Sequence, residues 1–260
     1  MDELCHKELA RIVVTENSYY LEQEQLVRVV DSAIEPDKIN KNLIAENFMN
    51  ILTVPFEWLV DHSIRAKELA IDCIKNAIKA RKEENASWLR LTGWAFHYIA
   101  DWGTPHHSPT SKSNPVLKSA GIGAIIGGIV GAISKSGKDK DEIRKGVTQG
   151  VLAGAGVGGG LGSINLAMKH SKFEALCDER WKVNCDIILK QFKINKQNNQ
   201  IHYDLVQTIK DFDKKMTELR DRCNRLPAKW IDKSNAQDFA AYMVQIALVM
   251  NFAYQIITKD

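Results

Sequence analysis

The residues of this chain best suited to chemistry are histidines and carboxylates that recur at short spacings. His97 and Asp101 are four residues apart, and so are His170 and Glu174. On a helix, side chains four residues apart project from one face, so each pair forms a compact two-point clamp. Imidazole nitrogens and carboxylate oxygens are ligands that zinc accepts readily. The two pairs together indicate a metal centre.

Other candidate ligands lie close to these pairs in the sequence. Pro105 ends the first helical pattern and is followed by His106 and His107, which places both histidines in a turn. Asp61 and His62 precede another helical pattern. A single histidine–carboxylate pair at this spacing is usually an exposed pair on a helix surface. Metal binding is favoured here because several such features occur together: two clamps, a Pro-x-His, and an acid and a histidine upstream.

These motifs resemble a known family. His97-Tyr-Ile-Ala-Asp101-Trp-Gly-Thr-Pro105-His-His107 is similar to the His-Tyr-x-x-Asp-x-x-x-Pro-x-His signature of zinc-dependent phospholipase C enzymes, which the fungal zinc-dependent single-strand nucleases share in form. His170-Ser-Lys-Phe-Glu174 resembles the family's later His-Ser-Lys-Tyr/Phe-Glu element. The resemblance extends from His6 to about residue 192. It implies an all-α bundle around a cluster of two to three zinc ions.

The resemblance also implies which residues bind the metal. The first zinc would take Asp37, His62, His97 and Asp101, the second His107, His170 and Glu174, and the third His6, Asp101 as a bridge, and the N-terminal group. The spacing from Asp37 to His62 is longer than the family usually has, so Asp61 and Glu35 are alternatives to Asp37. Family members typically begin with a tryptophan, whereas Met1 stands first here.

The activity implied by the resemblance is hydrolysis of a phosphodiester. Metal ions lower the pKa of a bound water and neutralise charge that grows on phosphoryl oxygens. We expect a water to attack phosphorus in line, with Asp37 as the catalytic residue that orients this water or accepts its proton.

The rest of the chain has the pattern of helices that would position these residues. Apolar residues recur at intervals of three and four, and strand signals are few. The prolines lie at helix boundaries, and a polar stretch at 194–200 separates two helical segments. The sequence predicts an all-α multi-helix bundle forming a single catalytic domain over 1–260. The predicted helices are 3–14, 19–33, 69–78, 89–99, 171–192, 203–225 and 236–257.

A glycine-rich insertion at 116–168 interrupts this bundle. Fourteen of the 16 glycines lie between Gly121 and Gly162, and many are four residues apart. On helices this spacing gives a stripe without side chains that lets two backbones approach closely. We expect a hydrophobic glycine-zipper hairpin, which would contact a membrane or form a soluble lid over the site. The same stripe would also permit self-association.

The amino-acid composition limits which binding partners and which cellular compartment are expected. A formal charge of +3 is too small to indicate a nucleic-acid partner. Five widely spaced cysteines and no visible signal peptide predict a cytoplasmic protein with free thiols, which the hairpin would associate with membrane.

The choice of substrate follows from three features. The nuclease relatives tend to have Asp at the position of Glu174, so Glu favours a phospholipase. The hairpin falls between two ligand motifs, where it could bring the site to a membrane. The sequence also has no basic stripe with stacking aromatic residues, which binding of single-stranded nucleic acid would need. We therefore expect a phospholipid membrane as the substrate surface. The alternatives are a nuclease or nucleotide phosphodiesterase, a glycine-zipper membrane-inserting protein with a structural metal core, and a metal-stabilised bundle without activity.

Overall fold

The fold is all-α, as the sequence predicts. The computed structural model describes residues 3–17, 21–38, 65–105, 173, 175–196, 204–226 and 230–259, and no strand occurs in these ranges. The helices are α1 (Glu3–Asn17), α2 (Gln23–Ser32), α5 (Ala66–Lys82), α6 (Ser87–Trp102), α9 (Leu205–Arg225), α10 (Trp230–Lys233) and α11 (Ala236–Thr258), with a further helix over 175–195 and a helical turn at 35–38. The predicted hairpin at 116–168 lies outside the described residues.

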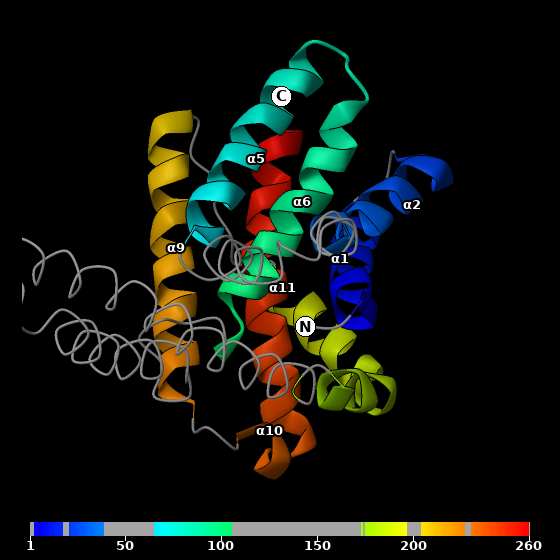
Figure 1. The fold of residues 1–260 in the computed structure, drawn as a ribbon, viewed down its shortest axis with the longest axis vertical. Coiled ribbons are helices and arrows are strands. Elements are labelled where there is room, and N and C mark those ends of the chain that lie inside the picture. Colours follow the sequence, from blue (N-terminus) through cyan, green and yellow to red (C-terminus); the bar gives the residue numbers. More distant parts are fainter. Residues whose placement is uncertain are drawn as a thin grey trace, which may run out of the picture.

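Helix α11 forms the centre of the bundle. It packs against α1, α5, α6 and α9, and in Figure 1 it runs through the middle of the molecule between the blue helices and the gold α9. Its side chains are apolar on nearly every face, which is the pattern of a helix enclosed by others. The helix meets the length and composition of a membrane span, yet 78% of its most apolar 18-residue window is buried within the bundle. We therefore assign α11 to the core.

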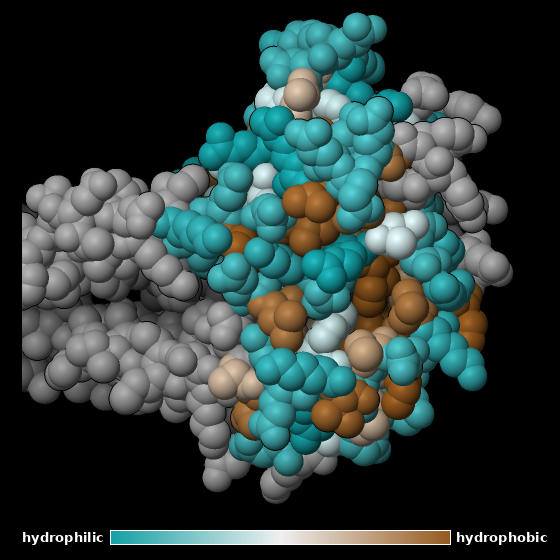
Figure 2. Space-filling view, turned by 90° about the vertical axis from the view of Figure 1, so that its right-hand side faces the viewer, coloured by the Kyte–Doolittle hydropathy of each residue, from teal (hydrophilic) through white to brown (hydrophobic). Residues whose placement is uncertain are grey.

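The surface of the described helices is mixed rather than uniformly apolar. Figure 2 shows one face, where brown apolar patches are set among hydrophilic residues. The exposed large apolar side chains belong to different helices, with Val27 on α2, Val183 in the 175–195 helix and Val206 on α9. Apolar residues scattered in this way are usual on protein surfaces and indicate no particular partner.

Local sequence explains where the helices begin. The Asn85 side chain accepts a hydrogen bond from the Ser87 amide at 2.9 Å, and α6 starts at Ser87, two residues before the predicted residue 89. Helix α2 begins at Gln23 rather than at the predicted residue 19, because Glu22 and Gln25 form a reciprocal capping box. The turn before α6 contains Glu84 at a φ of 52°.

Gly93 brings α6 unusually close to α2. A Cβ atom at this position would lie 2.5 Å from the Val29 carbonyl oxygen and 2.9 Å from the Ala33 amide nitrogen. Only glycine permits this approach, because the neighbouring atoms belong to the backbone. The contact places the end of α2, and the turn at 35–38 that follows it, against the middle of α6.

The other end of α6 is fixed by α9 and α11. The Trp102 indole Nε1 donates to the Met216 carbonyl oxygen at 2.7 Å. The Cys223 thiol and the Tyr242 hydroxyl both donate to the Gly103 carbonyl oxygen, at 2.6 Å and 2.9 Å. The two bonds to Gly103 satisfy a carbonyl at the end of α6, where carbonyls lack intrahelical partners. They also hold the turn of α6 that carries Asp101.

Candidate metal centre

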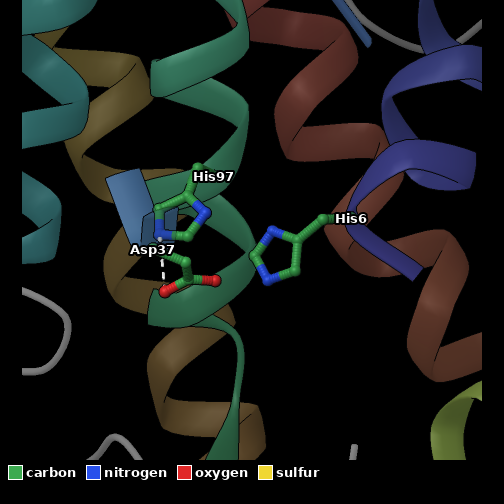
Figure 3. Close-up of side chains that lie close together, drawn as sticks. All are labelled: His6, Asp37 and His97. Carbon is green, nitrogen blue, oxygen red and sulfur yellow. Dashed lines mark ion pairs between the residues drawn. The ribbon is translucent and has the colours of Figure 1, made fainter. Parts of the chain in front are cut away.

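Four of the predicted ligands meet inside the bundle. His6 comes from α1, Asp37 from the turn at 35–38, and His97 and Asp101 from α6. One ligand atom from each of His6, Asp37 and His97 lies within 4.8 Å of the others. Figure 3 shows the two imidazoles directed toward each other from facing helices, with the Asp37 carboxylate beside His97.

His97 is oriented by a backbone hydrogen bond. Its Nδ1–H donates to the Ala33 carbonyl oxygen at 3.0 Å, so Nε2 is the nitrogen that has the lone pair when the ring is neutral. That Nε2 lies 3.0 Å from Asp101 Oδ2 and 3.8 Å from Asp37 Oδ1. Metal-binding histidines commonly have one ring N–H fixed in this way, because the bond sets the tautomer and the orientation of the ring.

Asp101 lies between the two imidazoles. Its Oδ2 is 3.0 Å from His97 Nε2, and its Oδ1 is 3.6 Å from His6 Nε2. Each carboxylate oxygen therefore faces a different histidine. If metal ions are bound, Asp101 could supply an oxygen ligand on the side of either histidine. The spacing of His97 and Asp101 on one face of α6 is confirmed.

His6 is buried in a way that calls for a ligand. The residue is 1% exposed, and neither ring nitrogen has a hydrogen-bond partner in the part of the chain that the structure describes. Its ring stacks on the His97 ring with centroids 4.7 Å apart. A buried polar atom without a hydrogen bond costs about 1–3 kcal/mol, so native proteins rarely retain one without a reason. A metal ion bound to His6 would satisfy such a nitrogen, and the donor set of two imidazoles and two carboxylates fits zinc.

Asp37, rather than Glu35, reaches the cluster. Glu35 Oε2 accepts from Arg90 Nε at 2.5 Å and from Trp94 Nε1 at 2.9 Å, so its carboxylate faces away from the histidines. Burial by itself would raise the pKa of Glu35, but these hydrogen bonds outweigh that effect and lower it. The Asp37 side chain is 26% exposed, which makes it the most accessible of the four clustered groups.

The remaining predicted ligands fall in segments that the structure does not describe. His62, with its neighbour Asp61, precedes the described start of α5, and His107 follows α6 after His106. His170 and Glu174 are likewise outside the described residues. The second zinc site, with its three predicted ligands, therefore stays a prediction from sequence. The first and third predicted sites each have at least one ligand in the observed cluster.

The two buried histidines have opposite pKa shifts. Burial, followed by the charge of His97, lowers the pKa of His6 to about 3. Burial by itself would also lower the pKa of His97, but the carboxylates of Asp101 and Asp37 outweigh it and raise this pKa to about 9. In the metal-free protein, His97 is therefore protonated and His6 is neutral near neutral pH.

The stability of the metal-free protein should be greatest near pH 6.5. His97, with its raised pKa, stabilises the fold below the unfolded value of 6.5, and this contribution is lost as the pH rises to about 9. His6, with its lowered pKa, stabilises the fold above 6.5, and this contribution is lost as the pH falls toward about 3. Urea unfolding of chelator-treated protein across this range measures the effect. A His97→Gln variant should lack the alkaline loss, and an equal alkaline loss in that variant would contradict the assignment.

One buried charge at this end of α6 was not anticipated from the sequence. Arg220 on α9 is 6% exposed and lies among the buried apolar residues of that helix, including Met216, Leu219 and Cys223. An arginine within the apolar stripe of an amphipathic helix is a readable signal. It was missed because 203–260 carries no recognisable motif.

No protein-family model, curated protein or solved structure matches this chain. The function is therefore inferred from the motifs and from the geometry of the cluster.

Proposed function

We propose that this protein is a zinc-dependent phosphodiester hydrolase of the phospholipase C type, which acts on membrane phospholipid. The observation that carries the proposal is the burial of His6, stacked on His97 and facing Asp101, with no hydrogen bond to either ring nitrogen from any described residue. A merely structural pair of histidines would be expected to have its nitrogens hydrogen-bonded. The phospholipase C-like motifs at 97–107 and 170–174 give the reaction class.

The chemistry that a bound divalent ion supplies is Lewis acidity, which lowers the pKa of a water and neutralises phosphoryl charge. The protein's own side chains would hold the ion and orient its ligands. The bond to Ala33 fixes the His97 ring, and Asp101 presents one oxygen to each imidazole. Because Asp37 is the most exposed of these groups, it is the one placed to meet an incoming water.

The reaction proposed is a hydrolysis at phosphorus. The water oxygen forms a bond to phosphorus, and Asp37 accepts a proton from that water. The bond from phosphorus to the glycerol oxygen breaks, and this oxygen takes up a proton from solvent, to which Asp37 returns the proton that it accepted. The products are diacylglycerol and the phosphorylated headgroup.

The membrane as partner is proposed from sequence features alone. The predicted glycine-zipper hairpin at 116–168 falls between His107 and His170 in the chain, so it would emerge beside the ligands. Its apolar glycine stripe suits contact with lipid or with a second helix.

The test is release of phosphorylated headgroup and diacylglycerol from vesicles of mixed phosphatidylcholine, phosphatidylethanolamine and phosphatidylglycerol. Zinc-loaded protein should release headgroup, and a chelator should stop the release until zinc is restored. Single-stranded DNA is assayed in parallel.

Two other outcomes would replace the proposal. Chelator-sensitive cleavage of DNA without headgroup release would identify a nuclease. Leakage of a trapped dye without release of headgroup, retained in a His97→Ala variant, would identify a membrane-inserting protein.

A further inference from the structure

The carboxylate of Glu35 is the centre of a hydrogen-bond network that the proposed chemistry does not use. Its Oε2 accepts from Arg90 Nε at 2.5 Å and from Trp94 Nε1 at 2.9 Å, and its Oε1 accepts from Ser32 Oγ at 3.3 Å. The Arg90 guanidinium also lies over the Trp94 ring, 4.7 Å from its centroid. The network therefore joins α6 to the end of α2 and to the turn at 35–38.

The energy of this network is not a sufficient reason for it. The side chains of Glu35 and Arg90 are 33% and 47% exposed. Ion pairs exposed to this extent contribute little to the stability of a fold, because water competes for both charges. What the network does supply is a fixed position for one carboxylate, because its three hydrogen-bond donors come from two helices.

Pro36 connects Glu35 stiffly to Asp37. The three residues belong to the helical turn at 35–38, and Pro36 is buried there. The proline ring fixes its own φ at about −65°, so the backbone between the two carboxylates has little freedom to rotate. An anchor on Glu35 therefore also limits where the Asp37 carboxylate can lie.

The turn at 35–38 contacts one face of α6 at two levels. Four side chains share this face, because they are separated by four, three and four residues: Arg90, Trp94, His97 and Asp101. Glu35 contacts the first two, and Asp37 Oδ1 lies 3.8 Å from His97 Nε2. The network thus lies about one helical turn before the clustered ligands on the same face of α6.

We propose that Glu35 is a positioning residue, which holds the Asp37 carboxylate at the metal centre by anchoring the turn at 35–38 to α6. The inference rests on the proposed function for the metal ion that Asp37 would bind. It gives Glu35, which the sequence left as an alternative ligand, a separate role at the same site. Glu35 acts through Asp37 and is not itself a ligand.

The experiment measures the zinc affinity of the full-length protein by competition with a chromophoric chelator. Glu35→Ala should weaken zinc binding by about 10- to 100-fold, the range expected when a residue that orients a metal ligand is replaced. Asp213→Ala is the matched control, because Asp213 also forms an ion pair between two helices, with Lys67 at 2.8 Å, away from the clustered ligands. The zinc affinity of this control should equal that of the wild type.

A second replacement tests whether Glu35 acts through Asp37. In an Asp37→Asn background, Glu35→Ala should weaken zinc binding no further, because the ligand that it positions is already lost. An equal further loss in that background would show that Glu35 only supports the fold, and would overturn the inference.

Cobalt provides the readout if Asp37→Asn binds zinc too weakly to measure. The visible absorption spectrum of bound cobalt depends on its ligands. At saturating cobalt, the spectrum of Glu35→Ala should differ from that of the wild type, because Asp37 no longer binds the ion in its place. A spectrum identical to that of the wild type overturns the inference.

The results separate this inference from the proposed function. If Glu35→Ala binds zinc as tightly as Asp213→Ala, the inference is wrong and the hydrolase proposal stands. If the expected loss of affinity is found but the wild type releases no headgroup from vesicles, the inference stands and the hydrolase proposal is wrong. A wild-type protein that binds no zinc overturns both proposals.

A conservative variant covers a failure to fold. Glutamine keeps an acceptor oxygen for Trp94 but lacks the charge that pairs with Arg90, so Glu35→Gln should have a zinc affinity between those of the wild type and Glu35→Ala. If circular dichroism shows that Glu35→Ala has lost its helices, Glu35→Gln is compared with Asp213→Asn. Weaker zinc binding by Glu35→Gln supports the inference, and equal binding overturns it.

Discussion

Replacing His97 by alanine should abolish hydrolysis while the protein stays helical. Removing only a partner that orients a metal ligand typically costs 10- to 100-fold in metal affinity or activity, so losing His97 itself should cost more than about 10³-fold. Alanine is the strongest helix former, so α6 should persist. Headgroup release from vesicles, zinc content and circular dichroism measure the three effects.

Thr92→Ala is the matched control for this variant. Thr92 is also a buried polar residue of α6, and its hydroxyl donates to the Trp88 carbonyl oxygen at 2.7 Å, away from the clustered ligands. Its replacement should leave turnover and zinc content close to those of the wild type. Undiminished hydrolysis by His97→Ala would remove the proposed mechanism.

Replacing Gly93 by alanine should destabilise the protein and disturb the metal centre together. Alanine in a helix interior normally gains about 1 kcal/mol over glycine. Here the new methyl group would lie 2.5 Å from the Val29 carbonyl oxygen and 2.6 Å from Ser32 Cβ, so α2 must move away from α6. Overpacking of this kind costs about 1–3 kcal/mol, and we expect the upper end because backbone atoms must shift.

The same movement should weaken zinc binding. The displaced end of α2 carries Ala33, which orients His97, and leads into the turn that carries Asp37. Urea unfolding and zinc affinity are the measurements. A variant that loses stability but binds zinc as tightly as the wild type would contradict this coupling.

Gly103→Ala provides the comparison. A Cβ atom there would meet the side chains of Ile246 at 2.9 Å and Leu219 at 3.3 Å, which can adjust by changing rotamer. Its loss of stability should therefore be smaller than that of Gly93→Ala. The reverse order would show that the α2–α6 contact is not the stricter constraint.

Much of the helical framework was predictable from the sequence, because it depends on local periodicity and capping. The apolar repeat at three and four residues predicts α5, α6, α9 and α11, and Asn85 marks the start of α6. The boundary of α2 was harder to predict, since Glu22 is not one of the residues usually found at the N-cap, although Gln25 is a usual residue three positions later.

Only part of the candidate site depends on residues that are close together in the sequence. His97 and Asp101 share a face of α6 because the helix repeat places residues four apart together, so the sequence alone determined that they meet. Spacing in the sequence could not show whether Asp37 or Glu35 lies at the cluster. The hydrogen bonds of Glu35 to Arg90 and Trp94 decided between them, and such contacts depend on how α2 packs against α6.

The family resemblance named His6 as a ligand, but only the tertiary structure shows which distant residues lie at the cluster. His6 faces His97 because α1 and α6 pack against each other. Arg220 lies at the end of α6 because its guanidinium packs over the Trp102 ring. The sequence by itself determined the helices and the paired ligands, through local periodicity and side-chain chemistry. The burial of His6 and the placement of Arg220 were set by packing between helices far apart in the chain, which no local pattern encodes.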